Sequence, residues 1–324
     1  MENILQGVSY ATQPTYYYAM RRIIGVGETV LDIIFRNDQP VKAVPGGSAF
    51  NAIVSVGRTG TPCVMATEVG DDHVGDIVTA FLRDNNVDTS YVFRSQGTQS
   101  HVSLAFLDDN NDAQYQFYKN HAVLTMHKNM PEVHEGDVVL FGSYFAINPN
   151  LREYVSTFLA KAKASDAILY YDINFRASHV KDLPRTFDYI LENMRQASVV
   201  RGSAEDFGIL FGTTDVEEIY GKHIAPYCHC FICTDAARPI QLRTPEVAAS
   251  FPAKAIETVS TIGAGDNFNA GFCYALLKEN VTCPQGLRAM TVEQWQPLIA
   301  MGQHFSSAVC QSLDNYIPKD FIVE

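Results

Sequence analysis

The feature that most restricts the fold of this chain is a regular alternation of strand-like and helix-like segments. Residues 61–69 have the composition of a buried strand, and residues 74–85 carry apolar side chains at the spacing of an amphipathic helix. The alternation resumes at Val138 and continues through the C-terminal third. Strands that alternate with helices in this way form a mainly parallel sheet covered by helices. The sequence therefore predicts an α/β fold.

Two segments depart from this alternation and predict a small β appendage. Residues 102–106 and 114–118 are rich in strand-forming side chains and flank a turn rich in Asp and Asn at 108–112, which is typical of a hairpin. Near the N-terminus, a segment rich in Ile and Val ends in a turn at 37–40. We expect the strands of the appendage at about 30–45 and 91–120.

Size and charge limit the partners that the chain can have. The 324 residues, 47% of them hydrophobic, are enough for one main domain with a substantial core. The formal charge of −12 and the isoelectric point of about 5.2 oppose binding to a polyanion, so we expect no nucleic-acid partner. A nucleotide can still bind, because backbone N–H groups at a helix start hold phosphate without net positive charge on the protein.

The sequence also indicates a soluble, cytoplasmic protein. It contains no apolar run of the ~18 residues that a membrane span requires, so no membrane partner is expected. Residues 1–19 precede the first strong strand and are interpreted as an N-terminal extension, which leaves residues 20–324 as the folded domain. The seven cysteines are scattered through apparent core segments, as reduced thiols would be.

One group of cysteines has residue types that suit zinc. Cys228, Cys230 and Cys233 lie close together, with His229 among them. The segment 228–234 nevertheless alternates like a buried strand, in which successive side chains point to opposite faces. The strand is the preferred interpretation, and stoichiometric zinc in a metal analysis would contradict it.

The strongest indication of chemistry is the motif Gly263-Ala264-Gly265-Asp266, which runs from a strand end into a helix. Glycines allow close approach of the backbone, and exposed N–H groups at a helix start can hold an anion that develops on a transferred phosphate. Asp266 at the helix entrance can accept a hydroxyl proton. Taken alone, the motif also fits an ordinary glycine turn whose Asp stabilises the helix dipole.

A second glycine motif lies in the N-terminal part of the chain. Gly46 and Gly47 open a helix of small residues that contains Asn51. On its own, Asn51 is an ordinary polar helix residue, and Asp32 is an ordinary charge at a strand end. Their interpretation therefore depends on the two motifs taken together.

The stretches 45–52 and 261–266 resemble, in the same order, the two signatures of the PfkB/ribokinase family of sugar and nucleoside kinases. The resemblance runs from about Arg22 to the C-terminus. It implies a ribokinase-like three-layer α/β sandwich, with a mainly parallel central sheet and a small β-sheet lid. It also implies ATP and Mg²⁺ as cosubstrates and phosphoryl transfer to a hydroxymethyl group.

The resemblance assigns roles to the residues of both motifs. Asp266 would deprotonate the acceptor hydroxyl, and the anion hole would be formed by Gly263, Ala264 and Gly265. The residues that would face the sugar are Asp32, Gly46, Gly47 and Asn51. Carboxylate and amide groups suit a polyol because together they accept and donate hydrogen bonds to neighbouring hydroxyls.

A polar stretch follows the apolar strand at 167–171. Asp172, Asn174 and Arg176 lie beyond the carboxyl end of that strand, where ligands bind in open α/β sheets. The stretch resembles the Asp-Xaa-Asn-Xaa-Arg segment of fructokinases and 2-keto-3-deoxygluconate kinases, which implies that Asn174 and Arg176 lie near substrate or phosphate. A weaker similarity adds Tyr118 of the lid. The structural alternative is a simple ion pair between Asp172 and Arg176.

On the nucleotide side the resemblance is less complete. It implies that the nucleotide is bound by Ser203, Thr234, Asp235 and Gly265. Glu205 and Asp206 would serve Mg²⁺, at a place where many relatives have Asn-Xaa-Xaa-Glu, and a hydrated Mg²⁺ tolerates carboxylates bridged by water.

Two substitutions near the nucleotide depart from the family pattern. Relatives have a glycine-rich turn after the strand ending at Thr234, whereas this chain has Asp235-Ala236, so the loop is expected to take another path. Ser260 stands where relatives often have Asp, in a region linked to activation by monovalent cations, so potassium dependence is not assumed.

The leading interpretation is a sugar kinase of the fructokinase or ketodeoxygluconate-kinase type. The alternatives are a ribokinase or nucleoside kinase, and a catalytically weak family member that only binds ligands. A Rossmann dehydrogenase is disfavoured, because Gly25-Val26-Gly27 lacks a third glycine at the fingerprint spacing. An exposed edge of the lid would also allow a homodimer, since strand edges invite pairing.

Overall fold

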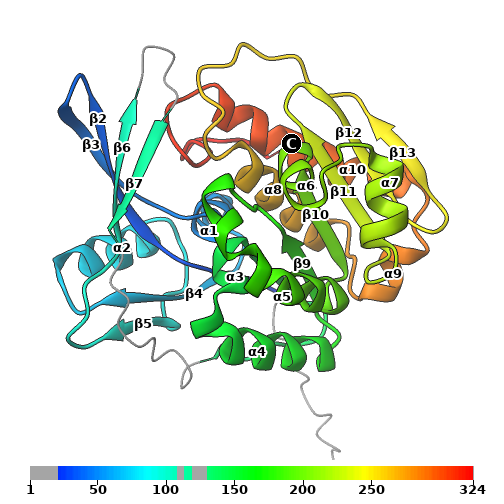
Figure 1. Cartoon of the computed structure of the whole chain (residues 1–324), viewed down its shortest axis with the longest axis horizontal. Coiled ribbons are helices and arrows are strands. Elements are labelled where there is room, and N and C mark those ends of the chain that lie inside the picture. Colours follow the sequence, from blue (N-terminus) through cyan, green and yellow to red (C-terminus); the bar gives the residue numbers. More distant parts are fainter. Residues whose placement is uncertain (1–20, 108–112, 119–129, 324) are drawn as a thin grey trace, which may run out of the picture.

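The computed structural model describes residues 21–107, 113–118 and 130–323, so the predicted extension at 1–19 and the predicted turn at 108–112 lie outside the described residues. The described residues form a large sheet covered by helices and a smaller sheet at one side (Figure 1). Both parts of the predicted architecture are therefore present.

The large sheet has nine strands in the order β13-β12-β11-β10-β9-β8-β1-β4-β5. Every neighbouring pair from β5 to β11 is parallel, whereas β12 and β13 are antiparallel additions at one edge. The strands are β1 (Ile23–Val26), β4 (Cys63–Gly70), β5 (Val92–Ser95), β8 (Val138–Gly142), β9 (Ile168–Asp172), β10 (Val199–Ser203), β11 (Cys230–Asp235), β12 (Arg238–Arg243) and β13 (Ala248–Phe251).

Helices cover both faces of this sheet and make three layers. One face carries α1 (Ser48–Arg58), α2 (His73–Arg83), α8 (Ala264–Lys278), α9 (Pro284–Arg288) and α10 (Val292–Cys310). The other carries α3 (Ser143–Ile147), α4 (Arg152–Ala164), α5 (Leu183–Gln196), α6 (Ala204–Phe211) and α7 (Val216–Glu218). Ile23 and Ile24 are neighbours on β1 and pack into opposite layers, because strand side chains alternate between faces.

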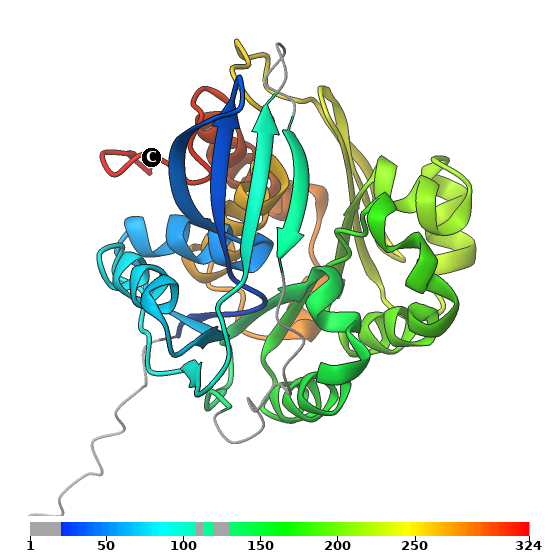
Figure 2. The ribbon, with the colours of Figure 1, turned by 60° about the vertical axis from the view of Figure 1, so that its left-hand side comes forward.

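The smaller sheet forms the lid, with the order β3-β2-β6-β7. Its strands are β2 (Val30–Arg36), β3 (Gln39–Gly46), β6 (Val102–Leu107) and β7 (Ala113–Tyr118). These strands lie at the left of the main body in Figure 1 and in front of it in Figure 2. β5 does not belong to them: Val92 pairs with Thr67 of β4 in the large sheet, so the predicted lid range of 91–120 is too wide at its start.

Cys230 and Cys233 lie in strand β11, as the alternation predicted, whereas Cys228 lies just before the strand begins. Cys230 packs into one core layer, whereas Cys228 and Cys233 pack into the other. Burial raises the pKa of Cys228 to about 11 and that of Cys233 to about 12, which favours protonated thiols over the thiolates that bind zinc. Within the described residues, no group of three or more His, Cys, Asp or Glu side chains is arranged to hold a metal.

Among the described helices, none has both the length and the apolar character needed to cross a membrane.

Candidate active site

The two glycine motifs meet at a hydrogen bond between their polar residues. Asn51 of α1 donates from Nδ2 to Oδ2 of Asp266 in α8, at 2.8 Å, although the two residues are 215 positions apart. The other end of the same amide, Oδ1 of Asn51, is buried and has no hydrogen-bond partner among the described residues. A buried amide oxygen normally has a partner. This oxygen is therefore available to accept a hydrogen bond from a ligand hydroxyl.

The loop before α8 is held by Asn267, a residue to which the sequence motif assigned no role. Gly263 precedes the helix with φ 77°, a left-handed backbone conformation. Asn267, in the first turn, donates from Nδ2 to the carbonyl oxygens of Gly263 and Asn315, at 2.8 and 2.9 Å. These bonds hold the turn. The first backbone N–H groups of a helix have no partner inside the helix, which is the arrangement that binds anions, although the N–H of Ala264 donates to the carbonyl oxygen of Thr261 at 3.2 Å.

Asp266 lies half-buried in the first turn of α8. Burial raises the pKa of this carboxyl group, while hydrogen bonds from Asn51 and Ser48 act to lower it. Among nearby charges, Asp172 acts to raise the pKa and Arg176 to lower it. A carboxylate with a raised pKa accepts a proton more readily than one in water, which suits a general base.

The glycines before α1 are required by the close approach of two backbone segments. Gly47 has φ 127°, and a Cβ there would lie 2.3 Å from the carbonyl oxygen of Glu28. At Gly46, a Cβ would lie 2.6 Å from Oδ2 of Asp32. The sequence Gly46-Gly47 therefore allows the base of the lid to pack against the start of α1.

Asp32 lies on the lid strand β2 and is only 8% exposed. Burial raises its pKa to about 6, an effect that a hydrogen bond donated by the Ser103 hydroxyl partly opposes. A buried carboxylate is normally compensated by several hydrogen bonds or by a cation. Asp32 thus has capacity left to accept hydrogen bonds from a polyol.

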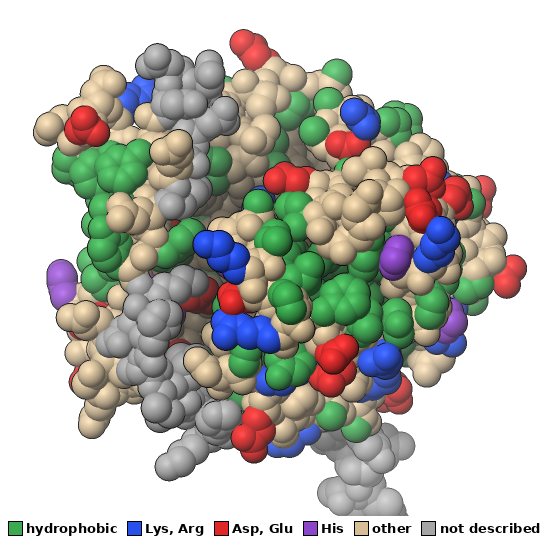
Figure 3. All heavy atoms as spheres, in the orientation of Figure 1, with side chains coloured by type: hydrophobic (Ala, Val, Ile, Leu, Met, Phe, Trp, Pro, Cys, Tyr) green, Lys and Arg blue, Asp and Glu red, His purple; other side chains and the backbone are tan. Residues whose placement is uncertain are grey.

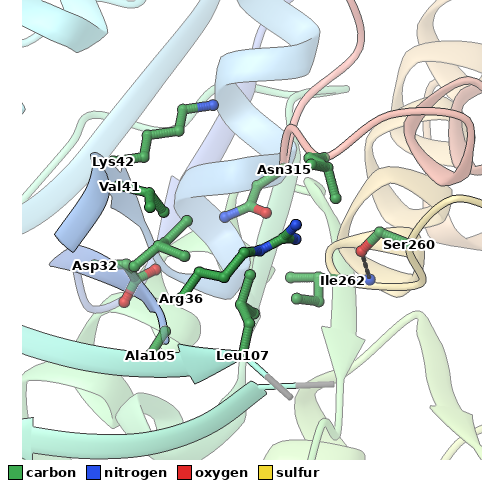
Figure 4. A pocket seen from close by; sticks show the side chains of 11 residues that line it. Asp32, Arg36, Val41, Lys42, Ala105, Leu107, Ser260, Ile262 and Asn315 are labelled. Carbon is green, nitrogen blue, oxygen red and sulfur yellow. Dashed lines mark hydrogen bonds between the residues drawn. The ribbon is translucent and has the colours of Figure 1, made fainter. Parts of the chain in front are cut away.

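A pocket of about 310 Å³ extends from Asp32 along the inner side of the lid. In Figure 4, the side chain of Arg36 extends into it from the same strand, opposite Ile262 and Asn315 of the body. Figure 3 shows the recess between the lid and the body. The remaining lining residues are Ile34, Val41, Lys42, Ala105, Leu107, Ser260 and Leu313. The pocket therefore combines polar groups with apolar walls, as small-molecule sites do.

The register of the lid decides which aromatic residue of β7 faces Asp32. Ser103 is the partner of Asp32 on β6, and Phe117 is in turn the partner of Ser103. Tyr118 pairs with Val102, one residue away. Because side chains alternate along a strand, Phe117 lies on the face of Asp32 and Tyr118 lies on the opposite face.

Asn174 and Arg176 lie in the loop beyond β9, as expected. Asn174 has φ 37° and donates from Nδ2 to the hydroxyl of Ser143, at 2.6 Å, and Ser143 itself has φ 51°. The two residues follow the neighbouring strands β9 and β8, so strained backbone gathers at the carboxyl edge of the sheet, where such strain often marks a functional site. Arg176 is exposed and acts electrostatically on Asp266.

Asp172 is paired with Arg201 and not with Arg176, so the structural alternative for that pair was wrong. Nη1 of Arg201 donates to Oδ1 of Asp172 at 2.9 Å, and Nδ2 of Asn269 donates to Oδ2 at 2.8 Å. Sequence reasoning missed Arg201 and Asn269. The available signal was a charged residue inside the apolar strand Val199–Ser203, since a buried charge requires a partner.

The expected metal residues do not form a cation site of their own. Oδ2 of Asp206 accepts hydrogen bonds from the backbone N–H and the hydroxyl of Ser203, both at 2.7 Å, which forms a capping box at the start of α6. Ser203 and Asp206 therefore stabilise a helix end. Glu205 is exposed and is the carboxylate of this group that remains open to solvent. Ser203, Glu205 and Asp206 therefore do not form a set of ligands that fits Mg²⁺.

The turn after β11 keeps a left-handed backbone without glycine. Thr234 accepts a hydrogen bond from Nη2 of Arg201 at 2.7 Å, and Asp235 pairs with Arg238 at 3.0 Å. Ala236 has φ 45°. Alanine therefore adopts a strained left-handed conformation here, which glycine adopts without strain. The expectation that this loop takes another path than in relatives stays a prediction.

Comparison with known proteins identifies the family and the fold of this chain. A family model described as pfkB family carbohydrate kinase matches residues 20–320. Fructokinase-1 of Oryza sativa subsp. japonica is 28% identical over 253 residues, which cover 76% of this chain and 77% of the relative.

Two solved structures share the fold. Aminoimidazole riboside kinase from Salmonella enterica, complexed with aminoimidazole riboside and an ATP analog, has a TM-score of 0.80 at 20% identity and covers 93% of this chain and 97% of its own. Fructokinase from Vibrio cholerae O395, bound to fructose, ADP and calcium ion, has a TM-score of 0.79 at 20% identity and covers 91% and 94%. These similarities confirm the ribokinase-like fold, and with the family match over 20–320 the chain belongs to the pfkB family of carbohydrate kinases.

Proposed function

We propose that this protein transfers the γ-phosphate of ATP to a hydroxymethyl group of a free sugar, with fructose as the first acceptor to test. The proposal rests on the hydrogen bond between Asn51 and Asp266, which lies beside the start of α8 at 263–265. It brings a candidate base, a candidate sugar ligand and a candidate anion site into one place. The fructokinase similarity motivates the choice of acceptor.

In the proposed reaction, Asp266 accepts the proton of the acceptor hydroxyl. The freed oxygen forms a bond to the γ-phosphorus of ATP as the bond to the β–γ bridging oxygen breaks, and ADP leaves. Charge on the transferred group is stabilised by the N–H groups at the start of α8, in residues 263–265. Positioning supplies most of the remaining rate, since little covalent chemistry is left to the protein.

The acceptor is proposed to lie between the lid and α1. Asp32 and the free Oδ1 of Asn51 would accept hydrogen bonds from its hydroxyls, and Gly46 leaves room beside both. Asn174 and Arg176 are proposed to contact the acceptor or the phosphates from the other side. Thr234, Asp235 and Ser203 remain proposed neighbours of the nucleotide. Glu205 is the exposed carboxylate that would contact the water shell of a Mg²⁺ ion bound with ATP.

The register also supports a proposal for the lid. Phe117 shares the face of Asp32, so it is proposed to pack against the carbon skeleton of the sugar. The substitution Phe117→Ala is expected to raise the KM for the acceptor more than Tyr118→Ala does. An equal effect of both substitutions would contradict the assignment of faces.

The function is tested by ATP consumption in a coupled assay with fructose, 2-keto-3-deoxygluconate, ribose and adenosine as acceptors. The protein and its Asp266→Asn variant are compared, with Asp188→Asn as a control because Asp188 is an exposed carboxylate on α5. We expect turnover with a sugar that the control retains and that Asp266→Asn loses by several orders of magnitude. Turnover with adenosine alone, or none with any acceptor, would overturn the proposal.

A homodimer through the lid is proposed as well. Tyr118 is 53% exposed on the face of the lid opposite Asp32, and it lies on β7, one of the two edge strands of the small sheet. Edge strands with apolar side chains favour pairing with another chain. Light scattering that detects only monomer at micromolar concentration would contradict this proposal.

A further inference from the structure

Arg201 is a buried cation that the two family motifs do not include. It lies on β10 and is 6% exposed, with Nη1 bonded to Asp172 at 2.9 Å and Nη2 bonded to Thr234 at 2.7 Å. Withdrawing both charges of such a pair from water is unfavourable, and an apolar pair of similar volume is often at least as stable. Stability alone therefore does not explain why the pair is present.

The guanidinium of Arg201 lies directly against the candidate anion hole. A Cβ at Gly265 would be 3.0 Å from Nη1, 3.0 Å from Nη2 and 3.4 Å from Cζ. Two equal distances to the terminal nitrogens and a longer one to the central carbon mean that the outer edge of the guanidinium, not its flat face, is turned toward Gly265. That edge carries the forked N–H groups that match phosphate oxygens. A positive charge therefore lies behind the loop that would hold the transferred phosphate.

A chain of hydrogen bonds also ties Arg201 to α8. Asp172, which accepts from Arg201, accepts at its other oxygen from Nδ2 of Asn269 at 2.8 Å. Asn269 in turn accepts from the hydroxyl of Tyr170 at 2.9 Å, and it lies one turn after the anion hole. The chain joins β10, β9 and α8, so it holds the start of α8 at the carboxyl edge of the sheet.

Arg201 further balances the charges around Asp266. The groups that act on Asp266 are Asn51 and Ser48 from α1, Asp172 at the end of β9 and Arg176 in the loop that follows. Asp172 acts to raise the pKa of Asp266, and its nearest cation is Arg201. Loss of Arg201 would leave that carboxylate uncompensated beside a base that must be ionised to act.

We propose that Arg201 is a positioning residue for phosphoryl transfer, which holds Gly265 and α8 in place through Asp172 and supplies positive charge behind the anion hole. This inference rests on the proposed kinase function, because the anion that the loop holds is taken to be the γ-phosphate of ATP. Arg201 is not expected to contact the sugar.

The test replaces Arg201 by Met, which keeps much of the side-chain length and removes the charge. Calorimetry with ATP and with ADP should give about a tenfold weaker affinity for ATP and little change for ADP, because ATP alone brings a γ-phosphate to the loop. With fructose, kcat should fall by roughly 10²-fold, as when one anion-stabilising donor is removed. The acidic limb of the pH profile should move to higher pH.

The variant Arg201→Met/Asp172→Asn removes both charges and guards against loss of folding, because it leaves no unpaired carboxylate in the core. It should return the acidic limb toward its original pH while the ATP-to-ADP affinity ratio stays low. Arg201→Lys should also return the acidic limb of the pH profile to its original pH, because it keeps the positive charge. It should not restore kcat, because lysine lacks the paired N–H groups of the guanidinium. If Arg201 only stabilised the fold, its replacement would lower kcat but would change neither the pH of the acidic limb nor the ratio of ATP affinity to ADP affinity.

The inference is overturned if the ATP-to-ADP affinity ratio of the folded variants stays within about twofold of the original protein and kcat within about threefold. If the unaltered protein binds ATP but phosphorylates no acceptor, the proposed function fails, and the affinity ratio still decides the role of Arg201. If it binds no ATP at all, both proposals are overturned.

Discussion

Removal of the Asn51 side chain should shift the pH dependence of catalysis. Nδ2 of Asn51 donates to Oδ2 of Asp266 at 2.8 Å, and this bond stabilises the ionised carboxylate. A hydrogen bond to a charged group contributes about 1.5–3 kcal/mol. One pKa unit corresponds to about 1.4 kcal/mol, so Asn51→Ala should raise the pKa of Asp266 by about 1–2 units.

The direction in which the pH profile moves depends on the role of Asp266. A general base acts only when it is ionised, and loss of the donor favours its protonated form. The acidic limb of kcat/KM should therefore move to higher pH by about 1–2 units, with the lower value applying if water takes the place of the amide. The plateau should fall as well, because Asn51 is also a proposed sugar ligand, but the position of the limb does not depend on the height of the plateau.

The measurement is a coupled assay of initial rates with fructose from pH 5 to 9, on the original protein and on Asn51→Ala. Asn85→Ala is the matched control: Asn85 is also buried, and it donates at 2.7 Å to the neutral carbonyl oxygen of Phe81. Asn85→Ala should lower the free energy of unfolding but leave the acidic limb of kcat/KM at its original pH. A limb in Asn51→Ala that stays within about 0.3 units of the original, or moves to lower pH, would refute the reasoning.

Three further predictions concern single residues. Gly265→Ala should lower kcat by about tenfold or more, because its Cβ would press on Arg201. Gly208→Ala in α6 is the control and should retain activity, because its Cβ would lie 3.5 Å from the nearest atom; equal kcat values for the two variants would contradict the proposed anion hole. Ala236→Gly should raise the free energy of unfolding by about 1 kcal/mol in urea titrations, since glycine adopts φ 45° without strain, and a loss of stability would count against the turn geometry. Asp32→Asn should stabilise the protein by about 1–3 kcal/mol at pH 8 but not at pH 4. Burial raises the folded-state pKa of Asp32 to about 6, so the stability that its protonated form contributes is lost as pH rises through 6, and an equal gain at both pH values would show another cause.

Local patterns in the sequence were sufficient for the elements and for the backbone of the site. The central strands are buried on both faces and therefore appear in the sequence as short apolar runs between amphipathic helices, so the parallel sheet could be predicted. The lid hairpin could be predicted from two strand-like segments that flank a turn rich in Asp and Asn. The glycine motifs could be located because close approach and left-handed backbone, as at Gly47 and Gly263, strongly favour glycine. Ala236 marks the limit of that reasoning, since the surrounding structure imposes φ 45° on an alanine.

Strand pairing brings side chains together that the sequence alone does not identify as partners. Arg201 meets Asp172 because β10 lies beside β9 in a register that makes the two residues partners, whereas proximity in the sequence had suggested Arg176. In the lid, a register one residue different would have exchanged Phe117 and Tyr118 between the two faces.

Periodicity and glycine content are local properties, so the α/β class, the two sheets and the residue types of the site could be predicted from the sequence. The pairing of side chains could not, because it depends on tertiary contacts: Asp172 pairs with Arg201, and Asn51 reaches Asp266 across 215 positions. Those contacts depend on the packing of α1 and α8 on the same face of the sheet and on strand register. Both are set by the burial of the whole core and not by any one segment.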